Sequence, residues 1–200
     1  MAAFFQSLGK TITAGVVLLI VLIIILVAAA GAKVNAGDHG WWFFVMRWLH
    51  VTTGVMWIGL LWYFNFVQTP SMPKIPDAEK PAISKVIAPA ALFWFRWAAM
   101  ATLVLGVIIA LMGGYLVQAL TLQKPFTSIG IGAWLGIIMW FNVWFVIWPN
   151  QKKALGIVQV TPEEKAAAAK RAGMTSRINT MLSIPMLYFM VAQSHGGVTF

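Results

Sequence analysis

The chain has 200 residues, of which 60% are hydrophobic and 10% are charged, and its formal net charge is +9. Soluble domains carry about 25% charged residues, so this composition excludes a water-facing globular surface and favours a membrane protein. The basic residues lie mostly in short links between apolar runs, which argues against a basic face for nucleic acid. The absence of cysteine excludes disulfides, thiolate catalysis and covalent haem attachment through a C-x-x-C-H motif.

Five apolar runs follow one another along the chain, and a membrane-spanning helix needs about 20 such residues. We expect transmembrane helices at about residues 12–32, 41–67, 89–119, 129–148 and 178–195. Strands are not expected, because these runs do not alternate and an open sheet edge cannot satisfy its backbone groups in lipid. The sequence therefore predicts an all-α, polytopic membrane helical bundle, in which residues 1–200 form a single membrane domain.

Two helix ends are predicted from local signals. Pro149 is expected to close the fourth span. The polar stretch before the last span predicts a separate cytoplasmic helix at about residues 162–172. Thr161 and Glu164 have the spacing of a capping box, Pro162 suits the first helical position, and Gly173 is expected to end this helix.

The basic residues are distributed unequally between the two sides of the predicted membrane. Ten of them fall in segments on one side, whereas Lys33 and Lys124 fall on the other. The ten are Lys10, Lys74, Lys80, Lys85, Lys152, Lys153, Lys165, Lys170, Arg171 and Arg177. Cytoplasmic loops are enriched in Lys and Arg, so the N-terminus is expected inside and the C-terminus outside.

The histidines are candidate functional residues, and this orientation places His39, His50 and His195 in the outer half. His50 lies inside the second span, where an ionisable residue is costly and is therefore a candidate for function. Arg47 at i−3 and Gly54 at i+4 share its helix face. In a haem-binding helix the imidazole would ligate iron, the glycine would admit the macrocycle, and the arginine would meet a propionate.

His195, at the outer end of the last span, would supply the second axial ligand of a non-covalent b-type haem. Two alternatives stay open for these histidines. Copper or zinc would be bound by His39, His50 and His195 together. A purely structural His50 would donate a hydrogen bond to a neighbouring helix.

A second polar group lies toward the cytoplasmic side and consists of Arg96, Asn65, Asn142 and Asn179. No carboxylate lies within the four spans that carry these residues, so Arg96 needs another partner. The group has two interpretations: hydrogen bonds between helices, or a pocket for a small planar anion. No Ser/His/Asp arrangement or P-loop occurs, so hydrolase and kinase chemistry have no visible residues.

Several segments carry recognisable motifs. They are residues 47–51 with 54–59, residues 94–97, residues 142–152, residues 176–186 and the trailing His195. Together they resemble the membrane domain of the bacterial cytochrome-c-linked urate hydroxylases, also called urate oxidases. The resemblance extends from about Trp41 to His195.

The resemblance implies a multi-pass redox protein of the bacterial inner membrane, which in full-length relatives passes electrons to a C-terminal cytochrome c domain. Because this chain has no cysteine, we expect a stand-alone relative without that domain. The expected function is a membrane redox or electron-transfer subunit with haem b between His50 and His195, hence an oxidoreductase or a subunit of one. Its partners would be the lipid bilayer and other membrane subunits or a periplasmic cytochrome c. The alternative is a non-catalytic accessory subunit of a larger membrane complex.

Overall fold

The computed structural model describes residues 5–198, and every regular element among them is helical, which confirms the all-α class. The chain divides into two units, Met1–Trp42 and Phe43–Phe200. The predicted single domain is therefore a helical bundle preceded by a separate N-terminal unit.

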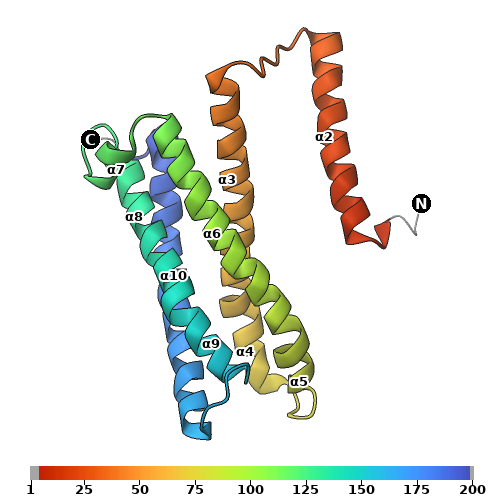
Figure 1. Ribbon diagram of the computed structural model, residues 1–200, viewed down its shortest axis with the longest axis vertical. Coiled ribbons are helices and arrows are strands. Elements are labelled where there is room, and N and C mark those ends of the chain that lie inside the picture. Colours follow the sequence, from red (N-terminus) through yellow and green to blue (C-terminus); the bar gives the residue numbers. More distant parts are fainter. Residues whose placement is uncertain (1–4, 199–200) are drawn as a thin grey trace. The chain divides into compact units, whose positions relative to one another are not determined.

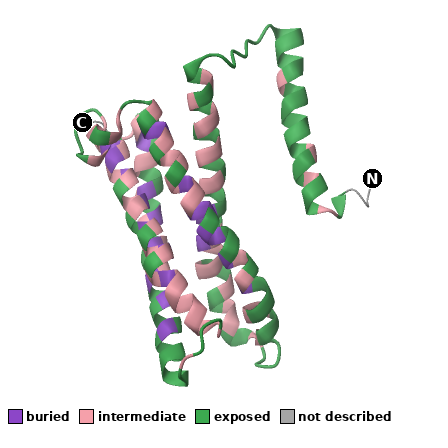
Figure 2. Ribbon diagram, in the orientation of Figure 1, coloured by how far each residue is buried: buried purple, intermediate pink, exposed green. Residues whose placement is uncertain are grey.

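The N-terminal unit contains helix α2 (Leu8–Ala30), the link that follows it and the first four residues of helix α3. The Ser7 side chain caps α2 by accepting a hydrogen bond from the backbone N–H of Lys10, and Gly31 ends it in the left-handed conformation at φ 67°. No residue of α2 is buried, as the green ribbon of Figure 2 shows. A helix that is apolar on all sides suits lipid as its surroundings.

The second unit is built on four long helical stretches that run alternately up and down in Figure 1. The main helix of each stretch is, in chain order, α3 (His39–Trp62), α6 (Ala88–Met112), α8 (Thr127–Phe141) and α10 (Pro162–His195). Short helices connect them: α4 (Thr69–Ser71), η2 (Met72–Lys74) and α5 (Lys80–Ala82) join α3 to α6, and α7 (Leu116–Leu120) joins α6 to α8. The third predicted span is shorter than expected, because the chain turns at Gly114 with φ 68° before α7.

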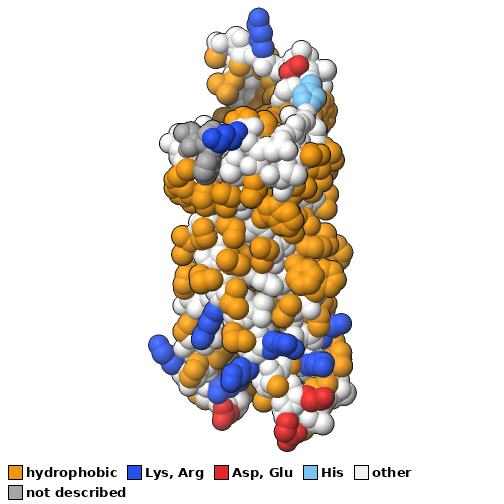
Figure 3. All heavy atoms as spheres, turned by 90° about the vertical axis from the view of Figure 1, so that its left-hand side faces the viewer, with side chains coloured by type: hydrophobic (Ala, Val, Ile, Leu, Met, Phe, Trp, Pro, Cys, Tyr) orange, Lys and Arg blue, Asp and Glu red, His pale blue; other side chains and the backbone are white. Residues whose placement is uncertain are grey.

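The two ends of this bundle differ in charge. The end that carries α4, α5 and α9 (Trp148–Ala154) includes Lys74, Lys80, Lys85, Lys152 and Lys153 and is called the basic end. The opposite end carries α7 and is called the α7 end. Figure 3 shows Lys and Arg gathered at the basic end, with hydrophobic side chains covering the length between the ends. This distribution agrees with helices that cross a membrane.

Three helices widen into a π-helical turn just before a proline. The turns η1 (Tyr63–Gln68), η3 (Ile83–Ile87) and η4 (Asn142–Ile147) precede Pro70, Pro89 and Pro149. Proline lacks a donor and its ring clashes with the carbonyl four residues earlier, and a wider turn relieves both problems. The expected helix end at Pro149 is therefore wrong, because the helix continues through α9 to Ala154.

Helix α10 begins as predicted but does not end where predicted. The capping box is confirmed, since Thr161 Oγ1 accepts from the Glu164 N–H and the Glu164 carboxylate accepts from the Thr161 N–H, both at 3.2 Å. The separate helix at 162–172 is wrong, because α10 runs through Gly173 to His195. A glycine inside a helix costs only about 1 kcal/mol relative to alanine. Burial of the flanking Ala172 and Thr175 offsets that cost.

Four helical stretches are long and apolar enough to cross a membrane: Leu8–Ala30, His39–Lys74, Lys80–Met112 and Thr127–Ala154. They correspond to the first four predicted spans. Helix α10 is not among them, because its C-terminal half carries polar side chains such as Asn179, Ser183 and Gln193. The membrane character is thus confirmed through four stretches, and the fifth span stays a prediction.

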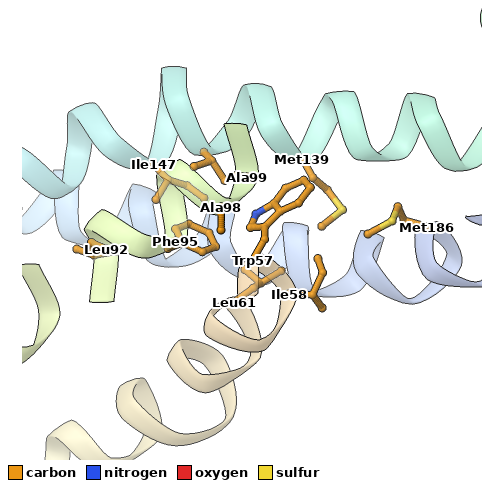
Figure 4. Close-up of a cluster of buried hydrophobic side chains, with 11 residues drawn as sticks. Trp57, Ile58, Leu61, Leu92, Phe95, Ala98, Ala99, Met139, Ile147 and Met186 are labelled. Atoms are coloured by element: carbon orange, nitrogen blue, oxygen red, sulfur yellow. The ribbon is translucent and has the colours of Figure 1, made fainter. Parts of the chain in front are cut away.

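The hydrophobic core lies where α3, α6, α8 and α10 meet (Figure 4). Trp57 projects into it beside Met139 and the α6 residues Phe95, Ala98 and Ala99. The buried residues of α3 are confined to positions 57, 58 and 61, and none is buried from position 39 to position 56. Helix α3 is therefore packed tightly only in its half toward the basic end.

Candidate functional site

His50 projects from the loosely packed half of α3 onto α6. Its Nδ1 lies 2.9 Å from the backbone oxygen of Thr102. A carbonyl oxygen only accepts, so Nδ1 carries the proton and donates it, which leaves the lone pair on Nε2. Metal-bound histidines commonly have one ring N–H held by a carbonyl in this way, with the other nitrogen on the metal. This bond from α3 to α6 is the inter-helical contact that the structural interpretation of His50 predicts, and ligation through Nε2 stays a prediction.

Gly106 provides the space for this imidazole. A Cβ added to Gly106 would lie 3.1 Å from Cε1 and 3.4 Å from Nδ1 of His50. Gly106 is one helical turn beyond Thr102, so the two residues present one face of α6 to the ring. Sequence reasoning missed both residues, because no local signal shows which helix faces His50.

Gly54 lies at the contact between α3 and α6. A Cβ added to it would meet Thr102 Cγ2 at 3.8 Å, and the hydroxyl oxygens of Thr53 and Thr102 are 3.1 Å apart. Gly54 therefore lies where α3 and α6 cross. The sequence predicted that Gly54 would face a haem macrocycle, but in the structure it faces Thr102.

Arg47 lies one turn from His50 toward the α7 end. Its guanidinium carbon is 4.6 Å from the centroid of the Phe43 ring, and its side chain is exposed. Burial raises the pKa of Tyr115, in the link after α6, and the positive charge of Arg47 acts to lower it. Arg47 therefore contributes a positive charge at the α7 end of the bundle. An anionic group bound near His50 would interact favourably with this charge.

His195 is exposed at the end of α10, and its Nδ1 lies 3.2 Å from the Val191 oxygen of the same helix. This end of α10 is held by the start of α8: the Gln193 side chain accepts from the Ile129 N–H at 3.2 Å and donates to the Pro125 oxygen at 3.0 Å. The structure records no contact between His50 and His195 within residues 5–198. Shared ligation of one iron stays a prediction.

The copper or zinc alternative gains no support. In the described part of the chain, no group of three or more His, Asp or Glu side chains is placed to hold a metal ion.

The three asparagines of the predicted polar group form hydrogen bonds between helices. Asn142 Nδ2 donates to Asn179 Oδ1 at 2.8 Å, and Asn179 Nδ2 donates to the Met139 oxygen at 2.9 Å. Asn65 Nδ2 donates to Ser176 Oγ at 2.8 Å. These contacts tie α10 to its neighbours, so the inter-helical interpretation accounts for the asparagines.

Arg96 does not join this network. Its side chain is only 9% exposed, and its guanidinium carbon lies 3.3 Å from the centroid of the Trp148 ring. No hydrogen bond between Arg96 and any of the asparagines is present among residues 5–198. The predicted four-residue pocket is therefore not assembled as a unit, and the Arg96 partner is an indole that sequence reasoning did not connect with it.

The comparisons with known proteins found one family model that matches the C-terminal part of the chain. Residues 115–200 match the family model described as urate oxidase N-terminal. The matched segment contains Asn142, Trp148, Asn179 and His195 and ends the chain, whereas His50 precedes it. No curated protein and no solved structure matches the chain significantly.

Proposed function

We propose that this chain is a membrane redox subunit that holds a non-covalent b-type haem through His50. The match of residues 115–200 to the urate oxidase N-terminal model supports a relation to such oxidases. The observation that carries the proposal is the hydrogen bond from His50 Nδ1 to the Thr102 carbonyl. It selects the tautomer whose Nε2 can bind iron. His195 is proposed as the second axial ligand.

The side chains around His50 suit this role. A bound haem b supplies one-electron transfer between ferric and ferrous iron. The Thr102 carbonyl orients the imidazole, and Gly106 lets the ring lie close to α6. Arg47 provides a positive charge one turn away for a propionate. The name of the matching family suggests oxidoreductase chemistry, with urate as the substrate class. The proposed electron acceptor is a separate periplasmic cytochrome c or another membrane subunit.

The test is the haem content of the purified full chain, measured by the Soret band and by the pyridine haemochrome. His50→Ala should abolish both signals, because it removes the proposed axial ligand in the interior of α3. His39→Ala is the matched control and should retain them, since His39 is exposed at the start of α3. A wild-type chain that shows no haem when haem is supplied would refute the proposal.

His195→Ala tests whether His195 is the second axial ligand of the haem iron. Loss of a strong axial ligand should turn a low-spin haem into a high-spin one, with a shifted Soret maximum. An unchanged spectrum would show that another group, or none, completes the iron.

A non-catalytic accessory subunit is the second candidate function. It is favoured by the apolar surface of α2, no residue of which is buried in the described part of the chain. Co-purification with a larger membrane complex by a chain that lacks haem would support this candidate.

The proposed location is the bacterial inner membrane, with the basic end in the cytoplasm, because Lys and Arg gather there. A reporter inserted after Lys153 should then be cytoplasmic, and one fused to the C-terminus should be periplasmic. Two reporters on the same side would show that α10 does not cross the membrane.

A further inference from the structure

Two cations share one indole at the basic end of the bundle. The guanidinium carbon of Arg96 and the Nζ of Lys152 lie 3.3 Å and 5.7 Å from the centroid of the Trp148 ring. Both distances refer to one ring, so the two charges are closer together than the Debye length of about 10 Å at 0.1 M salt. Their repulsion is therefore only weakly screened.

No acidic group compensates these two charges. Within residues 5–198 the one ion pair joins Lys80 to Asp77 in the exposed link before α5. The Glu164 carboxylate is engaged in the capping box of α10. The guanidinium of Arg96 has no hydrogen-bond acceptor among the described residues, although five N–H groups are available on it. A side chain that is 9% exposed and lacks both a counter-ion and acceptors is incompletely satisfied.

The buried side-chain amide oxygen of Gln151 is a second polar group here that lacks a hydrogen-bond partner. Gln151 is one turn from Trp148 in α9, and its Oε1 is buried without a hydrogen-bond donor. Rotating the amide would present its NH₂ group to an anion. Cations and amide donors of this kind bind oxyanions through charge-assisted hydrogen bonds.

We propose that Arg96 and Lys152, which both lie against the Trp148 indole, bind an oxyanion, a phosphate or carboxylate group, at the basic end of the bundle. Bound oxygens would accept from the Arg96 guanidinium and the Lys152 ammonium and would remove the repulsion between them. The site is separate from His50: Arg96 precedes Thr102 by six residues on α6, about 9 Å along the helix axis. It therefore stands independently of haem binding.

Phosphate occurs both in lipid headgroups and in solution, so the experiment uses both sources. The full chain is purified in a maltoside detergent and titrated with inorganic phosphate at constant ionic strength, or with short-chain phosphatidylglycerol. The readout is the thermal unfolding midpoint. A ligand that binds the folded state at 100 times its Kd raises the folded-to-unfolded ratio about 100-fold. The wild-type midpoint should rise to saturation with at least one probe.

Lys152→Ala should lose most of this rise. Lys153→Ala is the matched control that should keep it, because among the described residues the cation–π contacts of the Trp148 ring are with Arg96 and Lys152. Arg96→Gln should also lose it, and if that variant fails to fold, the lysine pair alone decides. A rise with phosphatidylglycerol alone identifies a lipid headgroup as the ligand, and a rise with phosphate identifies a soluble anion. No rise with either probe, or an equal rise in Lys152→Ala, would overturn the proposal.

Discussion

The two halves of α3 are packed in opposite ways. Toward the basic end, Trp57 and Leu61 are 2% and 0% exposed, and the side chains of Trp62 and Asn65 donate hydrogen bonds to serines of α10. Toward the α7 end no residue of α3 is buried, and His50 makes the main polar contact, with α6 (Figure 2). In the packed half the Trp62 and Asn65 side chains are paired with α10, although the buried Nε1 of Trp57 has no partner among the described residues. In the other half, one nitrogen of the His50 imidazole has no hydrogen-bond partner in the described part of the chain.

This contrast separates structural polar residues from candidate ligand-binding ones. In the packed half, Trp62 and Asn65 donate to serines of α10, and such bonds between helices are the usual role of polar side chains in membrane bundles. In the half that carries His50, Nδ1 is paired with the Thr102 carbonyl, and Nε2 has no hydrogen-bond partner among the described residues. Four substitutions sharpen this difference.

The largest effect is expected in the packed half, from Asn179→Ala. Asn179 is 0% exposed, and the substitution removes its bonds to Asn142 and to the Met139 carbonyl. Losing two buried hydrogen bonds should lower the free energy of unfolding by about 2 kcal/mol. Denaturant titration in detergent measures this. Asn150→Ala, which removes only a bond within its own helix, should cost less, and equal costs would argue against the inter-helical role.

In the His50 half, Gly106→Ala should affect haem more than stability. The new Cβ would lie 3.1 Å from His50 Cε1, so the ring must shift by a few tenths of an ångström. We expect about tenfold weaker haem binding, which corresponds to 1.4 kcal/mol. Spectrophotometric haem titration measures it. Gly59→Ala, where nothing lies within 4 Å, should leave haem affinity unchanged, and equal effects of the two substitutions would contradict the assigned role of Gly106.

A smaller effect is expected from Arg47→Ala. The side chain is exposed, so a pair with a propionate is partly hydrated and contributes at most about 1 kcal/mol. Haem affinity should fall a few-fold, and the difference from wild type should shrink as salt is added. Lys124→Ala, another cation at the α7 end, serves as the control. A salt-independent difference would show that Arg47 acts through packing.

The smallest effect concerns the exposed link between α4 and α5. A hydrogen bond and the positive charge of Lys80 lower the pKa of Asp77. Because the folded pKa is depressed, the contribution to stability is present above the unfolded pKa of Asp, about 3.9, and is lost as the pH falls through the folded value. Asp77→Asn should flatten the acid limb of the stability–pH profile slightly. An unchanged acid limb would show that the pair contributes nothing measurable.

The candidate site could be predicted only in part from the sequence. His50 is identifiable because an imidazole inside an apolar run is unusual, and Arg47 follows from helical spacing. Thr102 and Gly106 lie more than 50 residues away, and their register against His50 depends on how α3 and α6 pack. The pairing of Arg96 with Trp148 likewise depends on the rotation of two helices, which a sequence without an alignment does not reveal.

The sequence by itself determined the membrane character, four apolar spans and the capping box at Thr161, because these depend on composition and on residues within one turn of each other. The tertiary structure decided which helices continue past a glycine or a proline that local sequence would read as a helix end. Packing carries α10 through Gly173, and a π-helical turn carries the fourth span past Pro149. It also decided the partners of His50 and Arg96, because contacts between helices depend on rotation and register, which local sequence does not specify.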